Sequence, residues 1–236
     1  MPRLSNILSA AVMSFAFGLS APLAAEQRPV VVELYTSQGC SSCPPADALF
    51  DQLNEHDDVI AIAMHVDYWD YIGWKDEFGD SVHADRQRAY AAKAGRRSIY
   101  TPEMIVNGQT DIVGAKAMAL SMAIADHRSD PVYTTLKAQR SGASLRVQAD
   151  VPSTSMGPME IHVMHVNPTH TSKITRGENR GKTIRYTNIA HSLKVAGTWD
   201  GESPLDLTVG GLGSDPVVVL LQQADAGAII SAARVD

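Results

Sequence analysis

Positive charge is in short supply in this sequence. Its 236 residues include 20 lysines and arginines against 26 aspartates and glutamates, and the positive residues are scattered along the chain. A protein that binds nucleic acid needs a basic stripe to attract the phosphate backbone. We therefore expect no nucleic-acid partner.

Long apolar runs are missing beyond the N-terminus, and so are internal repeats and low-complexity tracts. A bilayer-spanning helix needs about 20 predominantly apolar residues, so we expect no stable membrane insertion of the mature chain. The one long apolar stretch, Ile7 to Leu23, follows Arg3 and precedes the small residues Ala24 and Ala25. This pattern is typical of a secretory signal peptide, here residues 1–25, with an uncleaved anchor as the alternative. The sequence thus predicts a periplasmic or secreted protein.

Cysteine is almost absent. Cys40 and Cys43, in the stretch YTSQGCSSCPPAD, are the only two, and no second pair or His-x-His pattern lies near them. In an oxidising compartment such a pair can be a structural disulfide or a thiol exchange site. A bridge across two intervening residues closes too small a loop to remove much chain entropy, so stability explains it poorly. The spacing favours redox chemistry, with a metal site and a plain structural bridge as alternatives.

Residues 26–130 alternate between strand and helix patterns. The order is strand, helix, strand, helix, strand, strand, helix, which is the order of a thioredoxin-like α/β domain. The expected strands cover residues 29–35, 58–66, 103–106 and 110–113, and the expected helices cover 45–56, 80–95 and 115–128. After Asp130-Pro131 alternating runs separated by turn residues take over. Residues 131–236 are therefore predicted to form an all-β domain.

The position of the two cysteines predicts separate roles for them. Cys40 follows the first strand and precedes a helix, whose positive N-terminal end would stabilise its thiolate, so Cys40 is the expected nucleophile. Cys43 lies within disulfide reach and would resolve the mixed disulfide formed with a substrate. We expect Cys40 to be exposed at the start of the loop and Cys43 to lie deeper.

Thr101-Pro102 stands immediately before the third strand, where proline cannot be an ordinary central-strand residue. A cis bond at a tight turn would account for it, and a trans proline at a strand start is the alternative. Here the sequence resembles the thioredoxin superfamily, in which a cis-proline lies against the Cys-x-x-Cys motif. The resemblance implies that Pro102 is that proline and that Thr101 offers backbone groups to an extended substrate peptide.

Four stretches together resemble a more specific family of secreted bacterial proteins, domain of unknown function 1223. They are YTSQGCSSCPPAD, HVDYWDYIGW, YTPEMIVNG and GENRGKTIRYTN, and the resemblance covers nearly the whole mature chain. The resemblance implies a thioredoxin-like N-terminal part and a β-rich C-terminal part, but it does not indicate a substrate.

Glu33 interrupts the apolar run VVVELY, seven residues before Cys40. A charged acid in a strand buried on both faces is costly, so it should be protonated, paired or functional. Thioredoxins are similar in having a buried aspartate beneath the resolving cysteine, one residue nearer to the first cysteine. The resemblance implies Glu33 as general base for Cys43, and a solvent-facing acid at a strand end is the alternative.

Aromatic residues make up only 6% of the sequence, yet five of them gather in residues 67–79. This segment leaves the same edge of the predicted sheet as the cysteine loop, where α/β folds bind their ligands. We expect Tyr68, Trp69 and Trp74 to line a substrate cleft beside Cys40, with an aromatic plug over the core as the alternative.

His65 ends the second predicted strand and could join Cys40 and Cys43 in a three-ligand copper(I) or zinc site. Our main hypothesis has no metal and no cofactor: a thiol-disulfide oxidoreductase that acts on the thiols and disulfides of other proteins. The alternative hypothesis is a non-catalytic thioredoxin-like module that binds copper or zinc, or a protein partner.

Overall fold

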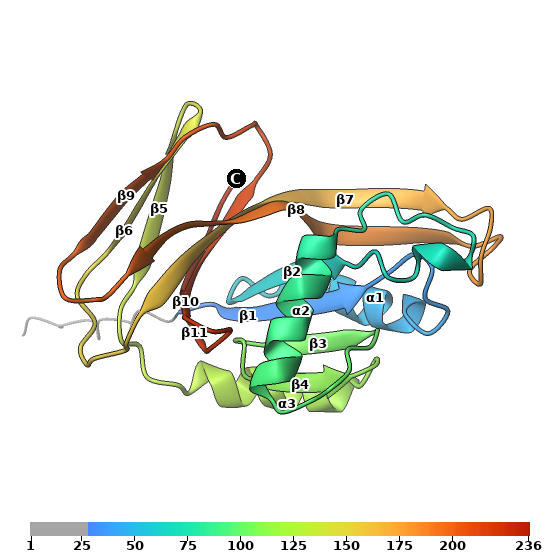
Figure 1. Ribbon diagram of the computed structural model, residues 1–236, viewed down its shortest axis with the longest axis horizontal. Helices are drawn as coiled ribbons and strands as arrows, with labels where there is room; N and C mark the ends of the chain where they lie inside the picture. The colour runs from blue at the N-terminus through green and yellow to red at the C-terminus, as the bar shows by residue number, and fades with distance from the viewer. Residues whose placement is uncertain (1–27) are drawn as a thin grey trace, which may run out of the picture.

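The computed structural model describes residues 28–236, so the signal peptide predicted at 1–25 lies outside the described residues. The protein is a mixed α/β structure with one large sheet and few helices (Figure 1). Its helices are α1 (Pro44–Asp51), α2 (Ser81–Lys93) and α3 (Ala117–Arg128), with the short 3-10 helices η1 (Gln52–Glu55) and η2 (Asp70–Ile72). Its strands are β1 (Val30–Thr36), β2 (Val59–His65), β3 (Glu103–Val106), β4 (Thr110–Val113), β5 (Leu136–Ser141), β6 (Ser144–Ala149), β7 (Met159–Lys173), β8 (Thr183–Trp199), β9 (Leu205–Val209), β10 (Val217–Gln223) and β11 (Ile229–Val235).

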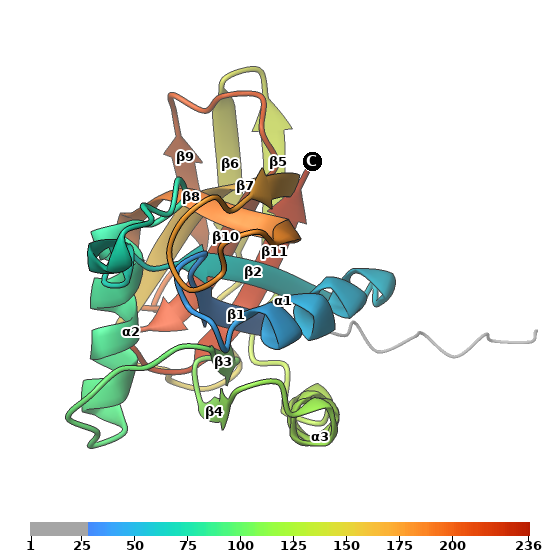
Figure 2. The same ribbon diagram turned by 90° about the vertical axis from the view of Figure 1, so that its right-hand side faces the viewer.

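The predicted helices and strands before residue 130 are all present. Strand β1 is buried along its whole length, as its continuous apolar run predicts. Its side chains alternate between two cores. Val32 and Leu34 pack with α1 and α3, whereas Val31 and Tyr35 pack with α2 on the opposite face of the sheet. Figure 2 shows α2 on one side of the sheet and α1 and α3 on the other.

The large sheet crosses the position at which the sequence predicts a domain boundary. Its strand order is β11-β10-β7-β8-β2-β1-β3-β4, so strands from both halves of the chain share it. Strand β2 runs parallel to β1 on one side and to β8 on the other, where Ala63 pairs with Ile189. Beyond α3 the described chain contains only strands, yet four of these strands extend the sheet begun by β1 to β4.

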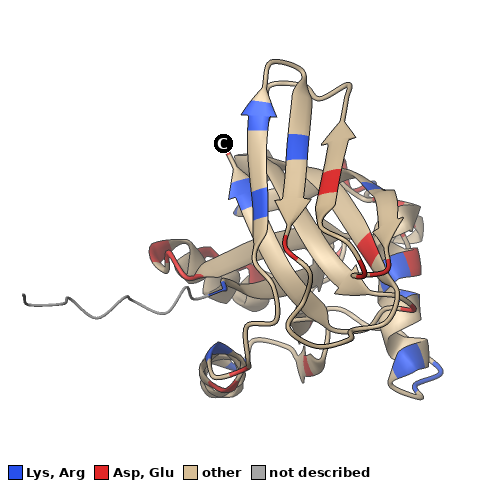
Figure 3. Ribbon diagram, turned by 90° about the vertical axis from the view of Figure 1, so that its left-hand side faces the viewer, with Lys and Arg blue, Asp and Glu red and all other residues tan. Residues whose placement is uncertain are grey.

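A second, three-stranded sheet, β5-β6-β9, lies against the far end of the large one. The two sheets enclose a third core, in which Leu145 and Val147 of β6 pack with Ile161 of β7 and Val219 of β10. Basic and acidic residues are interspersed over this end of the molecule (Figure 3). Within residues 28–236 no helix is long and apolar enough to cross a membrane.

Candidate functional site

The two cysteines form a disulfide at the start of α1. Their Cα atoms are 5.4 Å apart. Cys43 caps the helix, and its carbonyl accepts the amides of Ala46 at 2.8 Å and Asp47 at 3.0 Å. The bridge thus lies at the positive end of α1, which lowers the cost of a thiolate there.

Both cysteines are buried. Cys40 is 1% exposed and Cys43 is 0% exposed, while Ser41 and Ser42 between them are exposed. The prediction of an exposed Cys40 is therefore wrong. The physical reason is that two distant segments, the 174–182 loop and the aromatic segment around η2, close over the cysteine loop.

The first covering segment is the 174–182 loop, which joins β7 to β8. Asn179 is fully buried, and its amide donates to the carbonyls of Gln38 at 2.9 Å and Cys40 at 2.8 Å. Lys182 donates in turn to the Asn179 side-chain oxygen. Sequence patterns offer only a weak signal for this contact, namely a glycine-bounded turn with an asparagine inside it.

The second covering segment carries the aromatic residues predicted to line a cleft. Trp69 donates its indole N–H to Thr101 Oγ1 at 2.7 Å, and Trp74 donates to Gln38 Oε1 at 2.8 Å. A Cβ on Gly39 would lie 3.1 Å from the Trp69 Cβ, so the cysteine loop and Trp69 are in close contact. Tyr68 points elsewhere and donates to Gln87 of α2. The structure thus brings Trp69 and Trp74 to the cysteine loop and leaves Tyr68 facing α2.

The Thr101–Pro102 peptide bond is cis, as predicted from its position ahead of β3. Tyr35 of β1 pairs with Glu103 of β3, so Pro102 lies at the end of the sheet from which β1 leads into the cysteine loop. Thr101 accepts a hydrogen bond from Trp69, and Trp69 in turn contacts the cysteine loop at Gly39.

Glu33 does not join this site. Its carboxylate accepts hydrogen bonds from Arg86 Nε at 2.7 Å and from the Tyr90 hydroxyl at 2.7 Å, both on α2. Cys43 begins α1, on the other face of the sheet. The prediction that Glu33 is the general base for Cys43 is therefore wrong. Side chains of a strand point alternately to the two faces of the sheet, and the odd-numbered side chains of β1 point towards α2.

A buried acid, Asp47, lies on the helix that follows the cysteine pair and was not predicted as a site residue. Asp47 follows Cys43 by one helical turn, so the two side chains share a face of α1. Its Oδ1 accepts from Thr36 Oγ1 at 2.7 Å, and its Oδ2 is buried without a partner among the described residues. Burial raises the pKa of Asp47 to about 7. The spacing of Asp47 from Cys43 could have indicated this position. A residue four positions after a buried cysteine lies on the same, buried face of the helix.

His65 is bound to an acid. Its Nδ1 lies 2.7 Å from Asp76 Oδ2, and neither side chain is exposed. Burial alone would lower the pKa of His65, but the charge and hydrogen bond of Asp76 raise it. Asp76 also accepts the backbone amide of Gln38, which links this pair to the cysteine loop. Within residues 28–236 no group of three His, Cys, Asp or Glu side chains is arranged to hold a metal ion, and the alternative set of His65 with the two cysteines is not assembled.

Comparison with known families shows which family the chain belongs to. Residues 31–222 match the family described as "Protein of unknown function (DUF1223)". The chain belongs to the DUF1223 family. A crystal structure of an Agrobacterium tumefaciens protein is similar to this DUF1223 chain, with 27% sequence identity and a TM-score of 0.76. That similarity covers 90% of this chain and 96% of the other.

HBP35 of Porphyromonas gingivalis shares the fold of this DUF1223 protein at a TM-score of 0.63 and 14% identity. Here 89% of this chain and 75% of the other are covered. Comparison with curated proteins gives no match.

Proposed function

We propose that this DUF1223 protein is an exported thiol-disulfide oxidoreductase that acts on cysteines of other proteins. In this proposal β1-α1-β2-α2-β3-β4-α3 is a thioredoxin-like unit, followed by a β-rich part from residue 131. The strand order β2-β1-β3-β4 and the helices on both faces support it. No cofactor is needed, because the electrons reside in the sulfur pair.

One observation carries the proposal: the Cys40–Cys43 bridge lies at the N-terminus of α1, at the sheet end where Pro102 and Thr101 precede β3. In the reducing direction, the Cys40 thiolate attacks a substrate disulfide and releases one substrate thiolate. The Cys43 thiolate then attacks Cys40 Sγ and releases the second. The bridge closes, two electrons pass to the substrate, and two protons follow them. The same steps reversed oxidise a substrate dithiol.

Asp47 is the group that accepts the Cys43 proton in this mechanism. It is buried one turn below Cys43, and its Oδ2 is free of partners among the described residues. A pKa near 7 suits an acid that must both take up and release a proton near neutral pH. Thr36 holds the other carboxylate oxygen and so fixes the side chain.

The substrate is an extended peptide that binds where Trp69 and Thr101 meet. Tyr71, which stacks on Trp69 with ring centres 6.5 Å apart, is 80% exposed and offers that peptide an aromatic surface. Because Cys40 is buried, the 174–182 loop must move before a substrate sulfur can reach it. Binding of the peptide supplies the free energy for that opening.

The experiment that tests this function uses Cys43→Ser and Cys40→Ser as a matched pair. If Cys40 attacks and Cys43 resolves, Cys43→Ser accumulates mixed disulfides with proteins of a periplasmic extract, and Cys40→Ser accumulates none. A non-reducing gel shows the complexes, and mass spectrometry identifies the partners. The wild-type pair should have a reduction potential of roughly −120 to −270 mV, and a value below about −300 mV would mark an inert bridge and contradict the proposal.

A further inference from the structure

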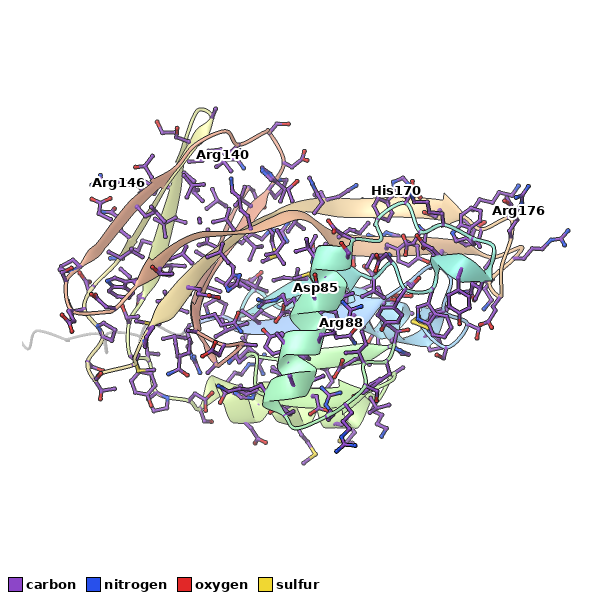
Figure 4. All side chains as sticks on the ribbon, in the orientation of Figure 1. Asp85, Arg88, Arg140, Arg146, His170 and Arg176 are labelled. Carbon is purple, nitrogen blue, oxygen red and sulfur yellow. A yellow bond between two sulfur atoms is a disulfide. The ribbon has the colours of Figure 1, made fainter. Side chains whose placement is uncertain are left out.

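The end of the β7–β8 hairpin, which contains the 174–182 loop over the disulfide, is strongly basic. Five of the 20 lysines and arginines of the chain lie between residues 173 and 185, against one of its 26 aspartates and glutamates. All five are exposed, and we call residues 173–185 the basic segment: its cations are Lys173, Arg176, Arg180, Lys182 and Arg185. The chain as a whole has a net charge of −6, so the basic segment has the opposite sign to the protein. Figure 4 labels Arg176 at the outer end of the hairpin.

Most of these positive charges have no partner within the protein. Arg185 forms an ion pair with Asp51, and Lys182 donates to the side-chain oxygen of Asn179. The others form no ion pair and no side-chain hydrogen bond with any residue of the described chain; they are Lys173, Arg176 and Arg180. Exposed cations of this kind are available to the anionic groups of another molecule.

The loop presents its two arginines on an ordered frame. The Ile174 amide donates to the Lys182 carbonyl at 2.9 Å, which closes the loop. Ile174 is 1% exposed and Asn179 is 0% exposed, so both anchor the loop from within, whereas Arg176 and Arg180 are on its outer side. Because the frame is already ordered, a partner that binds there loses little free energy to ordering the loop.

The basic segment contacts both parts of the candidate site. Asn179 donates to the Cys40 carbonyl at 2.8 Å. A Cβ on Gly177 would lie 3.1 Å from the Trp74 Cβ, so the loop also touches the aromatic segment. Each of the two arginines is next in sequence to one of these contact residues. A substrate that brings a sulfur to Cys40 must therefore pass close to both arginines.

The acidic residues of the aromatic segment beside the loop are bound within the protein. Asp76 pairs with buried His65 at 2.7 Å, and the Asp70 carboxylate accepts the amide of Asp76. The Glu77 carboxylate accepts from Ser172 Oγ and remains exposed. An extended anionic surface such as a membrane would meet this exposed carboxylate as well as the arginines, whereas a narrow acidic segment can contact the arginines alone. The surroundings thus favour a peptide over a membrane.

We propose that the basic segment selects protein substrates whose reactive cysteine is flanked by aspartate or glutamate. The substrate carboxylates pair with Arg176 and Arg180 while the substrate sulfur faces Cys40. The attraction raises the rate of encounter, and each arginine can bind a carboxylate through two parallel hydrogen bonds, which orients the peptide. This inference rests on the proposed oxidoreductase function, for which it names the substrate class.

The test uses two peptides that differ only in charge. Each has one disulfide between two cysteines, which are flanked by glutamates in the first peptide and by lysines in the second. The reduced full-length protein is mixed with each peptide, and the loss of protein thiols over time gives a second-order rate constant. Each constant is divided by that of the same peptide with dithiothreitol, which corrects for the intrinsic reactivity of the peptide. We expect the glutamate peptide to react about tenfold faster at low salt. This advantage should disappear in about 1 M sodium chloride, where charges are screened within about 3 Å.

Charge reversal identifies the residues responsible. The double variant Arg176→Glu, Arg180→Glu should react faster with the lysine peptide than with the glutamate peptide. The control Lys137→Glu, Lys194→Glu makes the same change of charge at exposed positions of β5 and β8 outside the basic segment, and it should keep the wild-type preference. Dithiothreitol is uncharged, so it should reduce the disulfide of both double variants at the wild-type rate, which shows that the loop still covers the bridge.

The outcomes separate this inference from the function on which it rests. If wild-type protein exchanges disulfides with both peptides at equal rates, selection by charge is overturned and the oxidoreductase function stands. If it reacts with neither peptide, both are overturned. Equal peptide rates together with binding to phosphatidylglycerol vesicles that Arg176→Glu, Arg180→Glu abolishes would show that the basic segment binds a membrane instead.

Discussion

Asn179 donates a hydrogen bond of 2.8 Å to the carbonyl oxygen of Cys40, and this contact ties the β7–β8 loop to the loop that carries the disulfide. A second bond from the same amide reaches Gln38. The disulfide of the N-terminal half is thus covered by a side chain from the C-terminal half.

Replacing Asn179 with Ala should make the disulfide easier to reach. The variant loses two buried hydrogen bonds, and the unfolding free energy should fall by about 1–3 kcal/mol. Reduction by dithiothreitol, followed by thiol labelling over time, should become roughly tenfold faster because the loop opens more often. Arg176→Ala, an exposed position in the same loop (Figure 4), is the control and should reduce at the wild-type rate. Equal rates for both variants would show that the loop does not limit access.

Asp47→Asn should remove a pH dependence of stability. The folded-state pKa of Asp47 is about 7 against 3.8 for an unperturbed aspartate, so the folded protein holds this proton more tightly than the unfolded chain does. The unfolding free energy of the wild type should therefore fall as pH rises from about 4 to 7, by roughly 4 kcal/mol from this group. Urea unfolding at several pH values should show the fall in wild type and in the exposed control Asp57→Asn, and not in Asp47→Asn. A parallel decline in all three proteins would refute the assignment.

Glu33→Gln should lower the free energy of unfolding without changing the reduction potential of the cysteine pair. It leaves the buried Arg86 charge without its partner, a loss of about 3–5 kcal/mol. Arg86→Met should cost a similar amount, and the double variant should recover part of the loss because neither charge then remains unpaired. The reduction potential of the Cys40–Cys43 pair should stay at its wild-type value in Glu33→Gln. A shifted potential would show that Glu33 acts on the cysteine pair.

Gly39→Ala should displace the aromatic segment. The new methyl group would lie 3.1 Å from the Trp69 Cβ and 3.2 Å from Ile72 Cδ1, closer than ordinary contact. We expect a loss of about 1–3 kcal/mol and a change in tryptophan fluorescence as Trp69 moves. Gly210→Ala meets nothing within 4 Å and should leave both measurements unchanged.

The local elements were predictable because their signals are local. Apolar spacing predicted the helices and strands of the first half. A proline ahead of β3 predicted the cis bond. Each of these inferences depends only on residues near one another in the sequence.

The rest depends on contacts between distant residues. Strand β1 is apolar on both faces, so the sequence could not reveal that Glu33 points towards α2 rather than towards α1. The burial of Cys40 follows from Asn179, which lies 139 positions away. The pairing of β2 with β8 could not be read from the sequence of either strand. Strands pair through backbone groups, and the apolar side chains of a buried strand do not indicate which strand lies beside it.

The pairing of Ala63 with Ile189 also sets an order of events during synthesis. Strands β1 and β2 leave the ribosome long before β8 exists, so the outer edge of β2 has hydrogen-bonding groups without partners for most of translation. A chain that stopped after α3 would retain this open edge permanently, and its apolar strands would be free to pair with another copy. Completion of β7 and β8 is therefore the step that gives the outer edge of β2 its partner.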